Sequence, residues 1–223
     1  MSPKAVWRRS ASALASAAVA AIVGGAPAGA ARAVEVSAGW ALTDVGLHDD
    51  GGGLVVGLGS RTALAPAGLD LVYALEYVQK RGAQPTFFSD VPAGFIVTDA
   101  EVTLHVLQPV VLFELSLSPA PLPRPYVGLS IALKLDEQWS AFPGVPSSAW
   151  GYKDVDFAAH FGLTRSLGPV RLDLRYSRGL TDQLVVDSGT ARLLKAEDPL
   201  PGVAEPRAGA RLSQWQAAAV LAF

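Results

Sequence analysis

The residues best suited to acid–base chemistry in this sequence are its three histidines, His48, His105 and His160. An imidazole titrates near neutral pH and acts as a general base when a neighbouring carboxylate orients it. Glu101 precedes His105, and Asp156 precedes His160, within segments that alternate between apolar and polar residues. Each pair is a hypothetical base with its orienting carboxylate. The scattered positions favour the plainer interpretation, in which hydrogen bonds inside a folded domain satisfy the histidines.

No catalytic or metal-binding motif accompanies the histidines. The sequence lacks a Gly-x-Ser-x-Gly elbow, a His-Glu-x-x-His zinc pair and a glycine-rich phosphate loop. It contains no cysteine, which excludes a thiol nucleophile, a disulfide framework and a cysteine-ligated metal. Asp49 with Asp50, and Asp154 with Asp156, offer fewer oxygens than a hard-cation site needs. The sequence therefore predicts no metal, no cofactor and no enzymatic activity.

The N-terminus has the three-part pattern of a secretory signal peptide. Lys4, Arg8 and Arg9 precede an alanine-rich run over residues 11–23, and Ala31-Arg32-Ala33 fits the small-x-small cleavage rule. Residues 28–30 are a second choice of cleavage site. The run is too short to span a bilayer, which argues against an uncleaved anchor. We therefore predict a signal peptide over residues 1–33 and a single mature domain over residues 34–223.

Composition and charge narrow the class of the mature domain. Half of the residues are hydrophobic and 17% are charged, yet no stretch after the N-terminus has the length of a transmembrane helix. Cleavage after residue 33 removes Lys4, Arg8, Arg9 and Arg32 and no acid, which lowers the formal charge from −2 to −6. An acidic mature chain argues against nucleic acid as a partner.

Period-two alternation dominates the mature chain and predicts strands with one apolar and one polar face. In the clearest segment Val170, Leu172 and Leu174 alternate with charged residues. Residues 53–64 alternate weakly because they are rich in glycine, and Pro109 implies an edge, a bulge or a strand end. The predicted strands cover residues 34–46, 53–64, 68–80, 99–116, 124–136, 154–166, 169–181 and 210–223.

The connections between these strands alternate in length. Short turns follow the second, fourth and sixth strands, whereas longer connections follow the others, including residues 81–98, 137–153 and 182–209. Short turns at one end and long loops at the other are typical of outer-membrane barrels, and a soluble sandwich has no reason to sort its loops this way. The sequence predicts an all-β fold, an eight-stranded antiparallel up-and-down transmembrane β-barrel.

In this interpretation the polar residues of the strands face the lumen and the aromatic residues face outward. An eight-stranded barrel is filled by side chains, so inward charges are expected to form a salt-bridged plug. The predicted polar network of the lumen comprises Glu76, Lys134, Asp156, His160, Arg171, Asp173 and Arg175, and His105 is also expected to face inward. Outward aromatic residues that would contact lipid headgroups, or a core in a soluble sandwich, are Trp40, Tyr73, Tyr77, Phe157, Tyr176 and Trp215.

The last predicted strand ends on an aromatic residue. Trp215, Leu221 and Phe223 share one face of it, which is similar to the C-terminal signal by which the barrel assembly machinery recognises its substrates. The competing interpretation is an ordinary closing strand of a periplasmic sandwich.

The mature chain resembles the broad outer-membrane β-barrel domain family that includes the PorT-like proteins, and more loosely the small OmpX- and OmpA-type barrels. The resemblance rests on the order of four segments, which are residues 71–82, 107–112, 124–129 and 173–180 (LVYALEYVQKRG, LQPVVL, RPYVGL and DLRYSRGL). It implies an architecture in the outer membrane, in contact with its lipid, and supplies no shared catalytic residues.

Three functions stay open at this point. The first is an outer-membrane barrel with a structural or surface-interaction role, whose long loops contact an unidentified ligand or partner protein. The second is a lipid-modifying outer-membrane enzyme, and the third is a soluble periplasmic β-barrel that binds an apolar ligand. The second would need a serine and a histidine within hydrogen-bond reach near the outer leaflet, and the sequence shows no strong pair of this kind. The third would bury the aliphatic face that the first gives to lipid.

Overall fold

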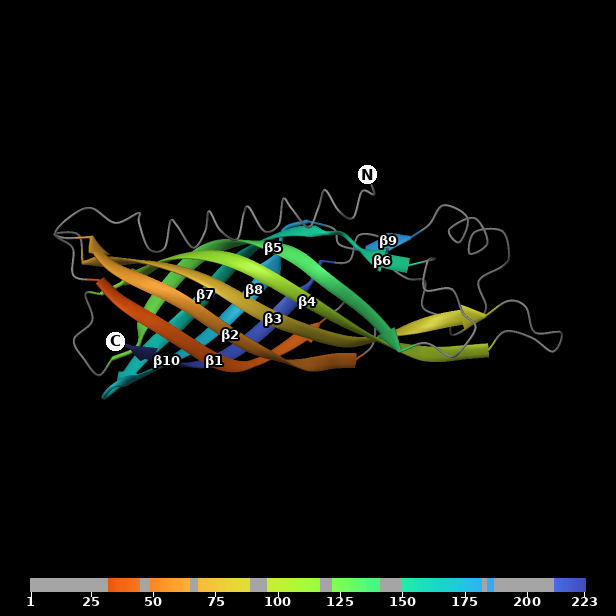
Figure 1. Ribbon diagram of the computed structural model, residues 1–223, viewed down its shortest axis with the longest axis horizontal. Coiled ribbons are helices and arrows are strands. Elements are labelled where there is room, and N and C mark those ends of the chain that lie inside the picture. Colours follow the sequence, from red (N-terminus) through yellow and green to blue (C-terminus); the bar gives the residue numbers. More distant parts are fainter. Residues whose placement is uncertain are drawn as a thin grey trace.

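The computed structural model describes residues 32–44, 49–64, 68–88, 96–116, 122–140, 150–181, 184–186 and 211–223. Eight strands close a barrel in the order β1-β10-β8-β7-β5-β4-β3-β2, with every neighbouring pair antiparallel (Figure 1). The predicted eight-stranded antiparallel barrel is confirmed. The strands are β1 (Arg32–Asp44), β2 (Asp49–Leu64), β3 (Leu69–Phe88), β4 (Ile96–Leu115), β5 (Arg124–Ser140), β7 (Val155–Leu167), β8 (Val170–Gly179) and β10 (Ser213–Ala222).

The first and last strands of the barrel close it along one seam. Glu35 lies opposite Ala222 in the register, and Asp44 lies opposite Ser213. Val34 and Phe223 extend the ladder, because each backbone N–H donates to the other's carbonyl, at 3.3 and 2.9 Å. No sheet edge is left open along this seam, which removes the unpaired backbone groups that an edge strand presents.

Glycine makes the short turns at one end of the barrel. Gly68, before β3, and Gly168, between β7 and β8, have φ angles of 60° and 62°. Residues with a side chain rarely adopt this left-handed conformation, whereas glycine adopts it without a steric penalty. The strand pairs next to these glycines are Leu64↔Leu69 and Leu167↔Val170. We call this end, where Phe223 also lies, the turn end, and the opposite end the loop end.

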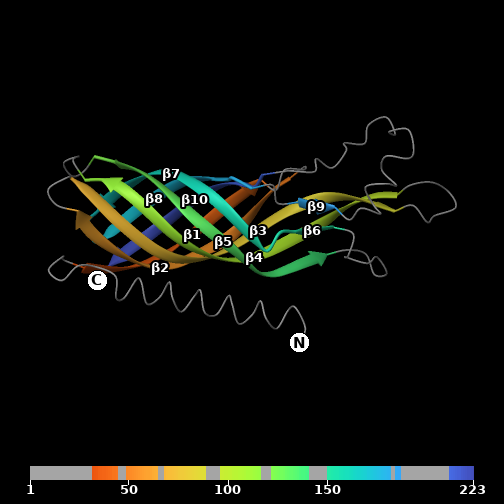
Figure 2. The same ribbon diagram turned by 90° about the horizontal axis from the view of Figure 1, so that it is seen from above.

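Two features at the loop end were not predicted. The β3–β4 ladder continues to the pair Phe88↔Ile96, and this hairpin projects past the barrel (Figures 1 and 2). A separate two-stranded sheet pairs β6 (Trp150–Tyr152) with β9 (Leu184–Val186). Both lie in segments predicted as loops. The strands β6 and β9 have three residues each, which is too short for a period-two signal.

Pro109 lies inside β4 rather than at its end. It pairs with Leu75 on β3, while the β4–β5 register passes from Leu107↔Leu133 to Val110↔Ser130 and leaves Gln108 and Pro109 without a β5 partner. A register shift lies nearby, between His105 and Val106. The strand therefore runs through the proline, and the missing N–H coincides with a gap on the β5 side.

Some predictions fall outside the described residues. The predicted signal peptide lies there except for its last two residues, which belong to β1, and so does most of the 182–209 loop. Within the ranges given above, no helix has both the length and the apolar character to span a bilayer.

Candidate functional site

The two faces of the barrel wall have opposite chemistry. Side chains that point inward include most of the charged residues of the strands, and those that point outward are mainly aliphatic and aromatic. Trp40, Trp215 and Phe161 are more than half exposed. Further exposed apolar residues on this outward face are Val34, Val36, Leu42, Leu54, Val56, Leu58, Phe113, Val127, Leu129, Ile131, Phe157, Leu163, Leu172, Leu174 and Leu221. This is the reverse of a soluble domain, in which apolar side chains fill the interior.

An arginine-centred cluster fills the lumen near the turn end. Arg61 donates to the Glu35 carboxylate at 2.9 Å, to Asp70 at 2.8 Å, and to both oxygens of Glu114 at 2.8 and 2.9 Å. Arg171 makes a second bidentate pair with Glu35, at 2.7 and 2.6 Å. We call these five residues the turn-end cluster, and its paired charges join strands β1, β2, β3, β4 and β8 across the lumen.

A second cluster, the central cluster, surrounds Arg175. The Arg175 guanidinium donates to both oxygens of Glu76, at 2.9 and 2.8 Å, and to Asp173 at 2.9 Å. The Tyr126 hydroxyl donates to Asp173 at 2.5 Å and accepts a hydrogen bond from Arg175 at 3.1 Å. Gln108 donates to Glu76 at 3.1 Å. Arg175 and Glu76 are 3% and 2% exposed, so their attraction acts with little screening by water.

Gly162 makes room for the tyrosine of this cluster. A Cβ placed on Gly162 would lie 2.3 Å from the Tyr126 ring and hydroxyl, far inside van der Waals contact. Gly162 is on β7, and its strand neighbours in register are Tyr126 and Arg175. The absence of a side chain here lets the Tyr126 ring lie over β7 and reach Asp173 on β8.

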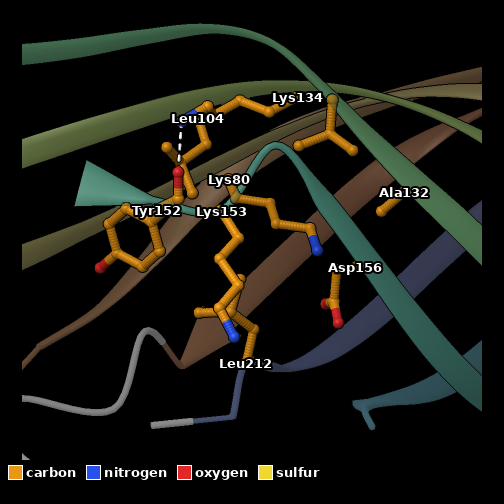
Figure 3. Close-up of a pocket in the computed structure, with 9 residues that line it drawn as sticks. Lys80, Leu104, Ala132, Lys134, Tyr152, Lys153, Asp156 and Leu212 are labelled. Carbon is orange, nitrogen blue, oxygen red and sulfur yellow. Dashed lines mark hydrogen bonds between the residues drawn. The ribbon is translucent and has the colours of Figure 1, made fainter. Parts of the chain in front are cut away.

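Above the central cluster the lumen becomes partly apolar. Val102, Leu104, Val106, Ala132, Tyr152 and Leu212 form a buried cluster. Lys80 and Asp156 line the same small cavity beside it, which has a volume of about 20 Å³ (Figure 3). Asp156 accepts from Thr181 at 2.6 Å, and His160 bonds Ser177 at 2.7 Å through Nδ1. His160 and Asp156 are therefore not bonded to one another, and the proposed base with its carboxylate does not form here.

Lys134 lies apart from the other predicted network residues. It donates to Glu137 at 2.7 Å and to the Tyr152 carbonyl, and its Nζ lies 3.2 Å from Asp154 (Figure 3). These contacts join β5 to the short strand β6 at the loop end. Burial and the Glu137 carboxylate raise the pKa of the Tyr152 hydroxyl, which keeps it neutral.

His105 is a correction to the sequence interpretation. It faces outward from β4, not into the lumen, and its Nδ1 lies 2.5 Å from the hydroxyl of the outward-facing Tyr77. The inward positions of β4 are the buried Leu104, Val106 and Gln108. The strand phase around Pro109 was misassigned because His105 is polar, and polarity alone was taken to mark the inward face.

The six predicted outward aromatic residues do lie on the outward face, and most lie toward the loop end. Trp215 packs against Tyr176, with ring centroids 5.0 Å apart and ring planes tilted by 49°, and it lies opposite Leu42 across the seam. Tyr77 bonds His105 at a similar height. Tyr73 lies lower on the wall, opposite Val111. Near the turn end the exposed aromatic residues are Phe113 and Phe223, at 43% and 79% exposure.

The residues of the predicted assembly signal lie on the seam strand β10 and its terminal extension. Trp215 and Leu221 are exposed, and the Phe223 side chain is the most exposed of the large apolar groups in the described chain. All three share the outward face, as the alternation predicts. Trp215 is near the loop end, and Phe223 is at the turn end.

Sequence reasoning missed most of the turn-end cluster. Glu35, Arg61, Asp70 and Glu114 carry the densest ion pairing in the described lumen, yet only Arg171 was predicted. Each occupies an inward position of a period-two strand, so a strand-by-strand phase assignment finds them. Arg61 was hidden because its strand is rich in glycine and alternates weakly. Among the described residues, no group of three or more histidine, aspartate or glutamate side chains is arranged to hold a metal ion.

Solved structures that are similar to this chain share little sequence with it. No known protein-family profile matches the chain, and no curated protein matches it. A crystal structure of Neisserial surface protein A (NspA) shares 14% identity over 87% of this chain and 99% of that one, with a TM-score of 0.46. The outer membrane protein Ail of Yersinia pestis, in a phospholipid bilayer nanodisc, shares 15% identity over 86% and 100% of the chains, with a TM-score of 0.38.

A third match corrects one prediction. The outer membrane enzyme PagL shares 12% identity over 84% of this chain and 98% of that one, with a TM-score of 0.41. The prediction of no enzymatic activity is wrong as an inference from the barrel, because a matched barrel is an enzyme. The match assigns no activity to this chain. The observations together establish a closed eight-stranded antiparallel barrel with ion-paired clusters inside and an apolar surface outside.

Proposed function

We propose that the chain is an integral outer-membrane β-barrel with a closed lumen, whose loop end serves as an interaction surface. The observation that carries this proposal is the inverted wall, with exposed leucine, valine, phenylalanine and tryptophan outside and paired charges inside. Exposed apolar patches above a few hundred Å² are rare on soluble monomers. A bilayer covers such a surface without any partner protein. A soluble periplasmic barrel would leave it in water.

The height of the apolar surface fits a bilayer. On β3 the outward positions from Leu69 to Tyr77 are apolar or aromatic, and the next ones are Gln79 and Arg81. At about 3.3 Å per residue and a tilt of about 40°, this segment is about 20 Å tall. Outer-membrane barrels have an apolar band of about 25 Å with aromatic residues at its borders. We call this zone the apolar belt.

The orientation follows from the connections. In bacterial barrels short turns face the periplasm and long loops face outside. The turn end would then be periplasmic, and the β3–β4 hairpin and the β6–β9 sheet would be exposed at the cell surface. A surface ligand or partner protein would contact these elements, and the barrel assembly machinery would recognise Trp215, Leu221 and Phe223. The finer assignment, to the PorT-like members of the family, rests on the order of the sequence motifs.

A closed lumen is part of the proposal. The turn-end and central clusters cross the lumen with direct ion pairs, and the cavity beside the turn-end cluster has a volume of about 30 Å³. That space is about the size of one water molecule. The barrel would therefore not conduct solutes, and side-chain pairs would link its strands.

Heat-modifiability on a semi-native gel tests the membrane assignment. Washed outer membranes from cells expressing the full precursor should contain a band that migrates anomalously until it is boiled, because a folded barrel resists the detergent. Recovery of the mature chain from the periplasmic fraction without detergent would contradict the proposal. The cytoplasmic fraction of the same cells is the control for incomplete export.

The outward pair of Tyr77 and His105 favours a second candidate, a lipid-directed activity. An imidazole hydrogen-bonded to a phenol at the border of the apolar belt has access to lipid ester groups, whereas His160 is 1% exposed inside the lumen. Mass spectrometry of total membrane lipid would show a modified species with the wild-type barrel and none with His105→Ala. His160→Ala is the matched control. Identical lipid profiles with and without the wild-type barrel would remove this candidate.

A further inference from the structure

A groove lined by described residues lies on the outward face near the turn end. Its volume is about 400 Å³, and its outward-facing walls are Pro123, Leu163, Arg165, Leu172, Leu174 and Ala217. Small-molecule sites begin at about 300 Å³. The groove crosses strands β7, β8 and β10, whose cross-strand pairs here are Leu163↔Leu174, Arg165↔Leu172 and Ala217↔Leu174.

The groove exists because large and small side chains meet there. Leu172 and Leu174 are 45% and 50% exposed and rise from β8. Their partners on β10, Ala219 and Ala217, have short side chains. Ala38 on β1, opposite Ala219, is also short and extends the floor of the groove. An alkyl chain laid against these side chains gains contacts that it does not make on an even surface.

Arg165 gives the groove a charged end. The side chain is exposed, and no hydrogen bond or ion pair to it is found within the described ranges. It lies near the end of β7 that is closest to the turn end, and its strand partner Leu172 is apolar. A guanidinium at the edge of the apolar belt extends its charge into the headgroup region and binds phosphate in a bidentate manner.

We propose that this groove binds one phospholipid with a net anionic headgroup, with its phosphate on Arg165 and an acyl chain along Leu163, Leu174 and Ala217. The inference rests on the proposed membrane location and adds a specific lipid site to it. A second copy of this chain fits less well. In the described ranges, the outward face near the turn end carries no aspartate or glutamate side chain to meet Arg165, since Glu35, Asp70 and Glu114 all point into the lumen.

Native mass spectrometry of the barrel refolded in a neutral maltoside detergent tests the site. Phosphatidylglycerol and phosphatidylcholine are added in equal amounts, and the wild-type barrel should retain one phosphatidylglycerol in preference to phosphatidylcholine. Arg165→Gln should lower that retention about fivefold, since one cation near an anionic lipid headgroup contributes about 1 kcal/mol to the binding free energy. Arg165→Lys should keep part of the preference. Ala217→Leu, which fills the groove, should lower retention of both lipids.

Arg178 supplies the matched control. It is also an exposed arginine, on the adjacent strand β8 but toward the loop end, opposite Ala159 and Ser213. Arg178→Gln should leave phosphatidylglycerol retention unchanged. Equal retention by Arg165→Gln and the wild type, equal binding of both lipids, or a dimer peak in place of a lipid adduct would each overturn the site. A wild-type chain without a heat-dependent band shift would instead count against the membrane barrel itself.

Discussion

At the scale of single residues, Arg175 holds the most demanding position in the lumen. It is the cation for two buried carboxylates, Glu76 and Asp173, and it also bonds the Tyr126 hydroxyl. Its removal leaves both carboxylates buried without a counter-charge. Breaking a buried pair in this way costs about 3–5 kcal/mol, whereas replacing all of its members with apolar groups costs much less.

We therefore expect Arg175→Met to lower the free energy of unfolding by about 3–5 kcal/mol. Urea unfolding of the barrel in detergent, followed by tryptophan fluorescence, measures the change. The double variant Arg175→Met with Glu76→Gln should recover part of the loss, since one buried charge is then absent. An unfolding midpoint equal to that of the wild type would show that the central cluster adds nothing to stability.

At the scale of elements, β7 depends on a glycine that faces the lumen. Gly162→Val should displace the Tyr126 ring and weaken its bonds to Asp173 and Arg175, which lowers the free energy of unfolding by about 1–3 kcal/mol. The same unfolding assay measures it. Ala159→Val is the matched control, because it adds volume on the outward face of the same strand. Equal stability of the two variants would mean that Tyr126 repacks freely.

The strands themselves were largely predictable from the sequence. A segment such as Val170 to Ser177 alternates without exception, and alternation of this kind defines both the strand and its two faces. The phase failed at His105, because a polar residue was taken to face inward, whereas burial alternates without a break along β4 and places His105 on the outward face. The sheet of β6 and β9 could not be foreseen, because each strand is three residues long and their pairing joins distant segments.

The ion pairs were predictable as a class but not as partners. Period-two spacing places Arg171, Asp173 and Arg175 on one face, and any barrel interior must pair such charges. Which carboxylate each arginine meets depends on the stagger of strands across the lumen. Arg171 pairs with Glu35, which lies 136 residues earlier in the sequence. Arg61 was missed because the glycines of β2 obscure the alternation of that strand.

At the scale of the whole molecule, the filled lumen predicts the absence of conductance. The barrel inserted into a planar bilayer should show no stepwise current, because the turn-end and central clusters occupy its cross-section. Single-channel recording measures this, with a general porin inserted under the same conditions as the positive control. Reproducible current steps that depend on the number of inserted barrels would contradict a closed lumen.

The seam between β1 and β10 has a consequence for how the molecule folds. The two strands that pair there stand at opposite ends of the described sequence, so their ladder joins the residues that are most distant along the chain. Contacts so distant in sequence carry a large loop-closure entropy and slow the folding of β proteins. Until that ladder forms, both seam strands present unpaired backbone groups. Barrel closure should therefore be a late, slow step, during which the chain would depend on a chaperone that covers those two edges.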